Sequence, residues 1–253
     1  MKKVLLLCGM LLAVTASIAA AAPGTNLRWT NCFGDAGAIN RTFACTSNTG
    51  SNILVGSFEL GADILTASGL EVVIDLASSG ASLPAWWQFK NAGTCRTTSL
   101  SANFTIPGTA AVCQDWAAAQ SSGGIGAYDI GGAAGANTAR VKMAIAVPPS
   151  ALVDLFAATE YFGYNLAINN AKTVGTGACA GCATPVCIVF NSVKVTTPIA
   201  ANDRVISGAT NGTDSNYATW QGGAGASSIR GTGCPQATPT RNATWGSVKS
   251  LYR

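Results

Sequence analysis

Hydrophobic and polar residues alternate one by one along five stretches of the chain. In the clearest, Leu70–Leu76, four aliphatic side chains share one face, while Glu71 and Asp75 lie on the other. A period of two residues is typical of a β-strand with one buried and one solvent-facing side. The same pattern recurs in Leu100–Ile106, Val141–Val147, Phe162–Ile168 and Val186–Val195.

Other segments give weaker signals. The alternation in Val186–Val195 changes phase near Asn191 and Ser192, which indicates a β-bulge. The weaker strands are expected at Ile53–Leu60, Trp86–Phe89 and Val205–Ile206. Short helical turns are expected in Thr109–Gln120, Ser150–Thr159 and Thr244–Arg253, and the Gly- and Ala-rich stretch 121–137 is interpreted as a long loop.

One-sided strands separated by turn-rich segments predict an all-β fold. We expect an antiparallel β-sandwich, Ig-like or jelly-roll-like, of about seven to nine strands with one or two short helices. Residues 22–253 are expected to form a single domain. The loop-rich C-terminal segment, about 200–253, is expected to pack on it through disulfides.

The first residues have the pattern of a secretory signal peptide. Lys2 and Lys3 precede an apolar run of about 15 residues, and a stretch of small residues follows. That run is shorter than the ~20 residues that span a bilayer. We therefore expect a signal peptide over residues 1–21, cleavage near Ala21, and a mature chain without a membrane span. The expected location is extracellular, at the cell surface or in the periplasm.

The nine cysteines support this location. Cys8 lies in the leader, and an even number in a secreted chain indicates disulfides. The remaining eight are Cys32, Cys45, Cys95, Cys113, Cys179, Cys182, Cys187 and Cys234. Local pairs are expected, Cys32 with Cys45 and Cys95 with Cys113, and Cys234 is expected to join the cluster Cys179–Cys187. Within that cluster, a structural zinc site and a redox Cys-x-x-Cys are the alternatives.

Composition removes several kinds of chemistry. The chain has no histidine, the commonest general base and metal ligand, and no Ser-x-x-Lys motif. Charged residues make up only 10% of the chain, and its basic residues are scattered singly, unlike a nucleic-acid surface. We therefore expect no cofactor, no metal, no nucleic-acid partner and no enzymatic activity. Four acids are candidates for glycoside hydrolysis and are interpreted as solvated surface charge: Glu71, Asp75, Asp154 and Glu160.

Aromatic residues supply the candidate binding residues. Trp86 and Trp87 are consecutive, and neighbouring positions of a strand point to opposite faces, so one ring is expected to be exposed. An exposed indole can stack on a sugar ring or anchor a partner. Trp220 and Gln221, in a Gly-rich loop, are further candidates. The alternative interpretation is that these rings cover the edge of the core.

Three segments carry a resemblance: Cys179–Asn191, Thr219–Gly223 and Thr244–Arg253. They resemble parts of secreted, cysteine-rich bacterial β-sandwich proteins to which no activity is assigned. The overall plan is also similar, at the level of the fold, to cohesin-like and carbohydrate-binding sandwiches. The resemblance implies a secreted sandwich and transfers no site residues, because a shared fold does not establish a function.

These observations favour a non-enzymatic structural, adhesive or binding protein of the bacterial cell exterior. Its candidate partners are a glycan or like subunits. A carbohydrate-binding module that uses exposed tryptophans is the alternative, and a glycoside hydrolase is a distant third.

Overall fold

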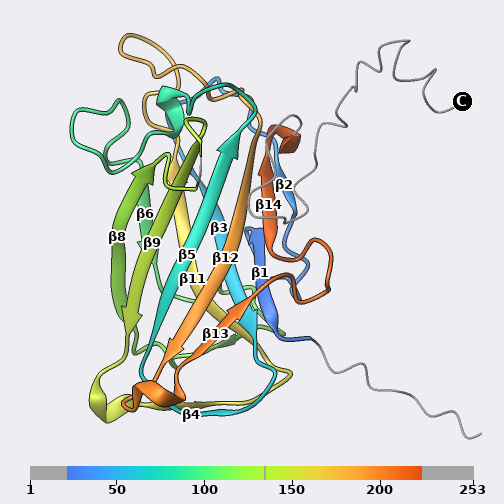
Figure 1. The fold of residues 1–253 in the computed structure, drawn as a ribbon. Coiled ribbons are helices and arrows are strands. Elements are labelled where there is room, and N and C mark those ends of the chain that lie inside the picture. Colours follow the sequence, from blue (N-terminus) through green and yellow to red (C-terminus); the bar gives the residue numbers. More distant parts are fainter. Residues whose placement is uncertain (1–21, 134, 224–253) are drawn as a thin grey trace, which may run out of the picture.

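The five alternating stretches all contribute to strands, because each can bury its apolar side between two sheets. The computed structural model describes residues 22–133 and 135–223. Two antiparallel sheets pack face to face, which confirms the predicted all-β sandwich (Figure 1). Seven of the described strands are six residues or longer.

The first sheet has the strand order β1-β3-β11-β6. Its strands are β1 (Gly24–Trp29), β3 (Ser51–Glu59), β11 (Glu160–Asn169), β6 (Leu100–Asn103) and the short β7 (Gln114–Asp115), which pairs with β11 in parallel. Gly56 is required in this sheet, because a Cβ at that position would lie 2.1 Å from the ring of Tyr164. The buried Tyr164 ring thus packs directly against the backbone of β3.

The second sheet has the order β2-β14-β12-β5-β9-β8. Its strands are β2 (Asn40–Arg41), β14 (Tyr217–Trp220), β12 (Val186–Thr196), β5 (Gly69–Ser78), β9 (Thr138–Ala146), β8 (Ser122–Ile130) and β13 (Arg204–Ser207), which pairs with the second half of β12. The register of β12 against β5 shifts between Phe190 and Ser192, so the predicted bulge is confirmed. A separate ribbon of β4 (Ile64–Ala67) and β10 (Val153–Leu155) lies at one end of the sandwich.

Three expectations about local structure are wrong. The stretch 121–137 is mostly the edge strand β8, whose glycines hide the alternation because an exposed edge needs few apolar side chains. Thr109–Gln120 contains β7 and a tight turn, since the carboxylate of Asp115 accepts hydrogen bonds from the N–H groups of Ala117 and Ala119. Ser150–Thr159 contains the end of a single 3₁₀ turn, η2 (Pro149–Ala151), followed by β10.

Trp86–Phe89 is also not a strand. Its first two residues belong to the 3₁₀ turn η1 (Ala85–Trp87), and both indoles are completely buried. Successive residues of a 3₁₀ helix are about 120° apart rather than opposite each other, so both rings can face the same core. The expectation of one exposed indole at this pair is therefore wrong.

The buried indoles form an aromatic cluster at one end of the core. Trp86 stacks on Trp220 with ring centroids 5.2 Å apart, and Trp87 meets Trp220 edge-on at 5.6 Å. The guanidinium of Arg96 lies 3.6 Å from the ring centroid of Trp86 and donates to the backbone oxygens of Trp86 and Asn169. Burial lowers the pKa of Arg96 to about 10. The cluster thus joins η1, β14 and the loop before β6.

Strand β1, which the pattern did not predict, closes one edge of the sandwich. One of its edges pairs with β3. On the other edge, the N–H groups of Thr25 and Leu27 donate to the carbonyls of Gly208 and Ser215, at 2.8 and 2.7 Å. Its side chains are buried although half of them are polar, which explains why no hydrophobic pattern marks it.

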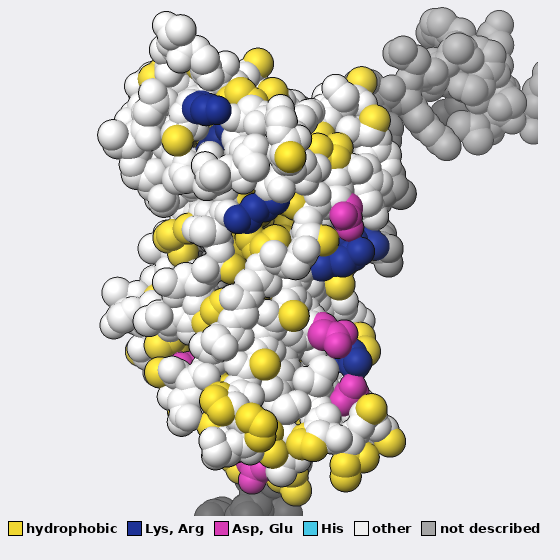
Figure 2. All heavy atoms as spheres, turned by 90° about the vertical axis from the view of Figure 1, so that its left-hand side faces the viewer, with side chains coloured by type: hydrophobic (Ala, Val, Ile, Leu, Met, Phe, Trp, Pro, Cys, Tyr) yellow, Lys and Arg dark blue, Asp and Glu magenta, His cyan; other side chains and the backbone are white. Residues whose placement is uncertain are grey.

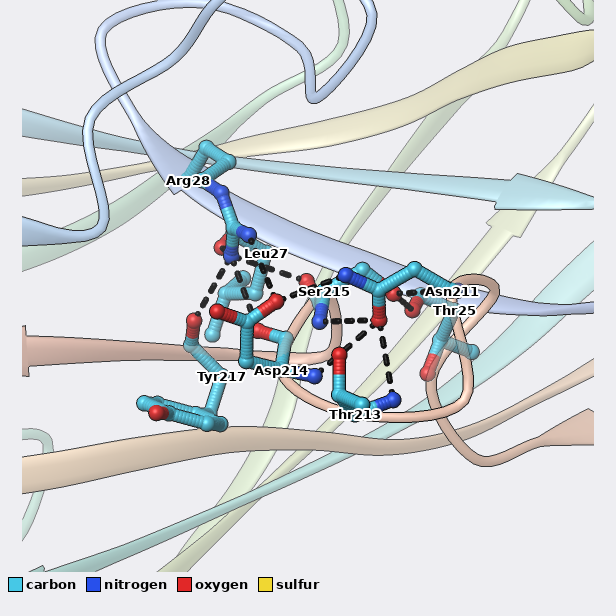
Figure 3. A network of polar contacts seen from close by, with 8 residues as sticks. All are labelled: Thr25, Leu27, Arg28, Asn211, Thr213, Asp214, Ser215 and Tyr217. Carbon is cyan, nitrogen blue, oxygen red and sulfur yellow. Dashed lines mark hydrogen bonds and ion pairs between the residues drawn. The ribbon is translucent and has the colours of Figure 1, made fainter. Parts of the chain in front are cut away.

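Arg28 fixes β1 to the loop before β14 (Figure 3). Its Nη1 lies 2.9–3.1 Å from the backbone oxygens of Leu27, Asp214, Ser215 and Tyr217. The Arg28 side chain is almost completely buried, so these carbonyls replace its water shell. The Oδ1 of Asn211 accepts from the N–H groups of the same loop, which holds the loop in the shape that presents the carbonyls.

Three disulfides connect distant parts of the described chain: Cys32–Cys113, Cys45–Cys182 and Cys95–Cys179. The expected local pairs are therefore wrong. The sequence separations are 81, 137 and 84 residues. A disulfide that closes a long loop strongly restricts the unfolded chain. In the chain-entropy model, each of these links therefore stabilises the folded state by about 4–5 kcal/mol.

The cluster Cys179–Cys187 matches neither of its two alternatives, a structural zinc site and a redox Cys-x-x-Cys. Cys179 and Cys182 bond to separate distant cysteines, so their Cys-x-x-Cys is neither a redox pair nor half of a zinc site. Cys187 is buried and also disulfide-bonded. Cys234 lies outside the described residues, and its pairing stays a prediction. Residues 200–223 form η3 (Ala200–Asn202), β13, β14 and η4 (Gln221–Gly223), whereas the helix expected at Thr244–Arg253 also lies outside the described residues.

The anchoring of β1 gives a first prediction. Replacing Arg28 by Leu removes a buried cation and leaves several carbonyls without a donor. We expect the free energy of unfolding to fall by about 3 kcal/mol, because hydrogen bonds from charged groups are worth about 1.5–3 kcal/mol each. Urea unfolding under non-reducing conditions measures the change. Arg204→Leu, at an exposed position of β13, is the control and should change stability little; equal effects of both substitutions would contradict the prediction.

Candidate functional site

Two adjoining hollows flank strand β6, and they share Ala102, Asn103 and Thr105. Each has a volume of about 420 Å³, within the range of small-molecule sites. We call them together the β6 cleft. Its first hollow is lined by Thr30, Ile53, Ser101, Ala102, Asn103, Thr105, Pro107, Asn165 and Ala167. Its second is lined by Ala102, Asn103, Phe104, Thr105, Ile106, Asp115, Ala119, Ser121, Ser122 and Gly123.

The cleft exists because the chain leaves the sheet after Asn103. The Oδ1 of Asn103 accepts from the N–H of Thr105 at 2.6 Å, which turns the chain out of β6. The neighbouring strand β11 then holds the departing segment, since the Nδ2 of Asn165 donates to the carbonyl of Thr105 at 2.8 Å. Short side chains on β6 and β11 leave the floor between these segments open.

A covering segment of two loops, 30–37 and 104–113, forms one wall of the cleft. The Cys32–Cys113 disulfide joins the loops, and the carboxylate of Asp35 accepts from the N–H groups of Ala111, Val112 and Cys113. Burial acts to raise the pKa of Asp35, but the three donors outweigh it and lower the pKa. The negative charge of Asp35 therefore supports the shape of the wall.

Residues on both rims adopt a strained backbone conformation. Thr30 has φ of 75°, a left-handed conformation that β-branched residues rarely adopt. Across the cleft, Ala118 and Ala119 have φ of 47° and 63°. Strain of this kind costs about 1–3 kcal/mol for each residue and is concentrated at binding and catalytic sites. The surrounding hydrogen bonds and the disulfide hold these rims in place.

The lining of the cleft is polar but almost uncharged. Among the described residues that line the cleft, Asp115 is the one ionisable side chain, and both of its carboxylate oxygens accept backbone N–H groups of the following turn. Figure 2 faces the β6 and β8 edge of the sandwich, and most of that surface is white, with charged side chains gathered chiefly along the right-hand side. The Oδ1 of Asn165 has no hydrogen-bond partner, although Asn165 is only 8% exposed.

The covering segment also contains Cys32, Asp35 and Cys113 within ligand distance of one another. Both sulfurs are joined in a disulfide, and the carboxylate of Asp35 already accepts three N–H donors. A metal ion needs thiolate sulfur and free carboxylate oxygen. This group therefore does not fit a metal.

The binding residues expected from the sequence are not on the surface. The side chains of Trp86, Trp87 and Trp220 are completely buried, so none of the three indoles is presented to a ligand. Gln221 is half-buried, and its Nε2 donates to the carbonyl of Phe43 at 2.6 Å. The interpretation that these rings cover the core, weighed as the alternative, describes them correctly. None of the four residues lines the β6 cleft.

The four acids considered for hydrolysis are separated, and two of them are buried. Asp75 in β5 forms a two-point ion pair with Arg140, at 2.7 and 2.8 Å. Glu160 in β11 accepts from the N–H groups of Phe33 and Gly34 and from Ser57. The expectation that both were solvated surface charges is wrong. Glu71 pairs with Lys194 on the surface, and the exposed Asp154 accepts from the N–H of Thr66, as solvated acids do.

A carboxylate pair that the pattern did not reveal lies where β3 meets β11. Glu59 and Glu160 are direct cross-strand partners, and each is 7% exposed. Burial and the nearby charge of Glu160 raise the pKa of Glu59. Neither of the two hollows is lined by this pair, and Glu160 serves to attach the covering segment to β11.

Exposed apolar side chains gather at the opposite end of the sandwich from η1. Leu65, Ile199 and Val205 are each more than 60% exposed, and Phe156 is 53% exposed. They belong to β4, β13 and the loops beside them. Figure 2 shows hydrophobic side chains grouped at this lower end of the molecule. A surface of this kind is typical of contacts with another molecule.

Comparison of the chain with protein-family models, curated proteins and solved structures finds no match. Among residues 22–133 and 135–223, no helix has the length and apolar character that crossing a membrane requires. The geometry of the site is therefore the basis for the functional argument.

The carboxylate pair gives a prediction about pH. Because the pKa of Glu59 is raised in the folded protein, its ionisation destabilises the fold once the pH exceeds that pKa. We expect Glu59→Gln to raise the melting temperature at pH 7–8. The gain should vanish as the pH falls below the ordinary glutamate pKa of about 4.3, where Glu59 is protonated in both states. Thermal unfolding at several pH values measures this.

The matched control is Glu71→Gln. Glu71 is exposed and lies 3.6 Å from the ammonium of Lys194, so its loss should lower stability slightly at neutral pH. A gain from Glu59→Gln that persists unchanged at low pH would contradict the electrostatic explanation.

Proposed function

We propose that the chain is a secreted, non-enzymatic binding protein of the bacterial cell exterior, and that the β6 cleft is its binding surface. The leader pattern and the disulfides support an oxidising compartment. The lack of histidine supports a role without catalysis, and the adjacent cross-strand acid pair, Glu59 and Glu160, lines neither hollow of the cleft. This is the class of function that the sequence favours, but the proposed binding surface is the β6 cleft instead of the tryptophans.

The observation that carries the proposal is the rigid construction of the cleft. Three contacts hold the covering segment: the Cys32–Cys113 disulfide, the hydrogen bonds to the Asp35 carboxylate and those to the Glu160 carboxylate. The rim residues keep strained backbone conformations. A binding site benefits from this rigidity, because groups that are already ordered lose little entropy when a ligand binds. The site can therefore bind through many weak contacts without rearranging.

The exposed apolar end favours a second candidate function, adhesion to like subunits. Leu65 and Val205 belong to β4 and β13, which line adjoining hollows together with Asp63 and Arg204, and they offer an apolar contact surface with a charged border. This function is compatible with a ligand-binding cleft, since the cleft and the apolar end are formed by different residues.

Filling the cleft tests the proposal. Ser101 is exposed on β6 and lines the first hollow, so Ser101→Trp should occupy that hollow while leaving the core unchanged. We expect the wild-type protein to sediment with washed bacterial cell envelopes. The variant should lose at least tenfold in apparent affinity, because its indole occupies the space of the ligand.

Ala144→Trp is the control, because Ala144 is an exposed strand residue on β9, outside the cleft. Both variants should unfold at the wild-type temperature, and the Ala144 variant should sediment normally. Failure of the wild-type protein to bind envelopes, or full binding by Ser101→Trp, would overturn the proposal.

A further inference from the structure

We infer that the β6 cleft binds an uncharged saccharide. This inference rests on the proposed function and deepens it by naming the chemical class of the ligand. It depends on three features of the cleft: its charge, its free hydroxyl groups and its apolar floor.

Charge excludes most other ligands. No lysine or arginine lines either hollow in the described part of the chain, so phosphates, nucleic acids and acidic polysaccharides would find no counter-charge. The single carboxylate, Asp115, is committed to backbone donors, so the cleft offers no strong site for a cation. Such a lining favours a ligand that is polar and neutral.

The cleft presents hydroxyl groups that the protein does not use. Five of the lining residues carry a side-chain hydroxyl that makes no hydrogen bond within the described residues: Thr30, Ser101, Thr105, Ser121 and Ser122. A hydroxyl both donates and accepts, which matches the mixed donor and acceptor character of sugar hydroxyls. The Nδ2 of Asn103 adds a donor at the rim shared by the two hollows.

Asn165 holds the wall of the first hollow in place. Its Nδ2 donates to the carbonyl of Thr105, which fixes the covering segment against β11. Its Oδ1 has no partner among the described residues and is closed to solvent, so a ligand in the cleft does not reach it. Asn165 therefore acts on the ligand through the position of Thr105, whose free hydroxyl lines both hollows.

Apolar groups complete the surface. Ile53, Ala102 and Ala167 contribute to the first hollow, and the half-buried Phe104 contributes to the second. The C–H face of a pyranose can pack on such groups. Because no tryptophan of the described segments lines the cleft as a stacking platform, we expect modest affinity, with a Kd on the order of 0.1–1 mM. Two hollows joined at Asn103 fit a short chain of sugars better than a single ring.

The experiment measures binding of uncharged oligosaccharides built from glucose, mannose, xylose or N-acetylglucosamine to the full mature protein by titration calorimetry. At least one of these is expected to bind, and the bound oligosaccharide should release the protein from cell envelopes. Ser101→Trp should raise its Kd about tenfold or more, because the indole occupies the first hollow. Ala144→Trp, at an exposed position of β9 outside the cleft, should leave the Kd unchanged.

A second variant tests the other hollow. Ser122→Trp fills the other hollow from β8 and touches none of the bonds to Thr105. It should abolish oligosaccharide binding while the melting temperature stays unchanged.

The outcomes separate the ligand class from the proposed function. If envelope binding is sensitive to Ser101→Trp but is displaced only by polygalacturonate, heparin or peptides, the proposed function stands and the saccharide inference is overturned. Absence of binding to every uncharged oligosaccharide would also overturn it. If oligosaccharides bind but none of the cleft variants weakens them, the site assigned here is wrong.

Discussion

The hydrogen bonding of β1 along both of its edges is the constraint on which the rest of the structure depends. One edge belongs to the first sheet, while the N–H groups of Thr25 and Leu27 donate to the segments that flank β14. Arg28 strengthens the same junction from the side chain. Because β1 ends at Trp29, Thr30 and Cys32 emerge over the outer face of the first sheet, where the disulfide to Cys113 forms one wall of the cleft. The shape of the candidate site thus follows from the placement of a strand at the far edge of the sandwich.

The disulfides show why the spacing of cysteines along the sequence does not predict how they pair. Cys45 follows β2, which pairs in parallel with β14, and Cys182 precedes β12, the other neighbour of β14. Only this order of strands brings the two cysteines together across 137 residues. The expected local pairs join cysteines that are close along the chain. The observed pairs join cysteines that the order of the strands brings close in space. The same holds for Cys95 and Cys179, which meet beside the aromatic cluster at the end of the sandwich.

The sequence predicted those strands whose two faces differ. β5, β9, β11 and β12 each carry a regular apolar side, and even the bulge in β12 was visible as a change of phase. The hydrophobic pattern did not predict β1 and β8, for opposite reasons. β1 buries polar side chains that find partners only in the folded state, and β8 is an exposed, glycine-containing edge. The sequence did not predict the β6 cleft either, because asparagine, serine and threonine are ordinary residues of turns. What distinguishes Asn165 is the lack of a partner for one oxygen, and only the packing of β11 against the covering segment creates that condition.

The burial of the tryptophans changes what kind of recognition the surface can perform. Trp86, Trp87 and Trp220 pack against one another and, with Arg96, stabilise the end of the sandwich that two disulfides also link. Indoles used in this way are unavailable as stacking platforms, so binding must depend on the positions of hydrogen-bonding groups. Such groups discriminate between ligands only when they are held still, because a mobile hydroxyl or amide adapts to several partners at an entropic cost. The strained rims, the disulfide across the covering segment and the fixed amide of Asn165 supply that rigidity at the β6 cleft. A weak but selective site for a neutral polar ligand is therefore the kind of site that this arrangement favours.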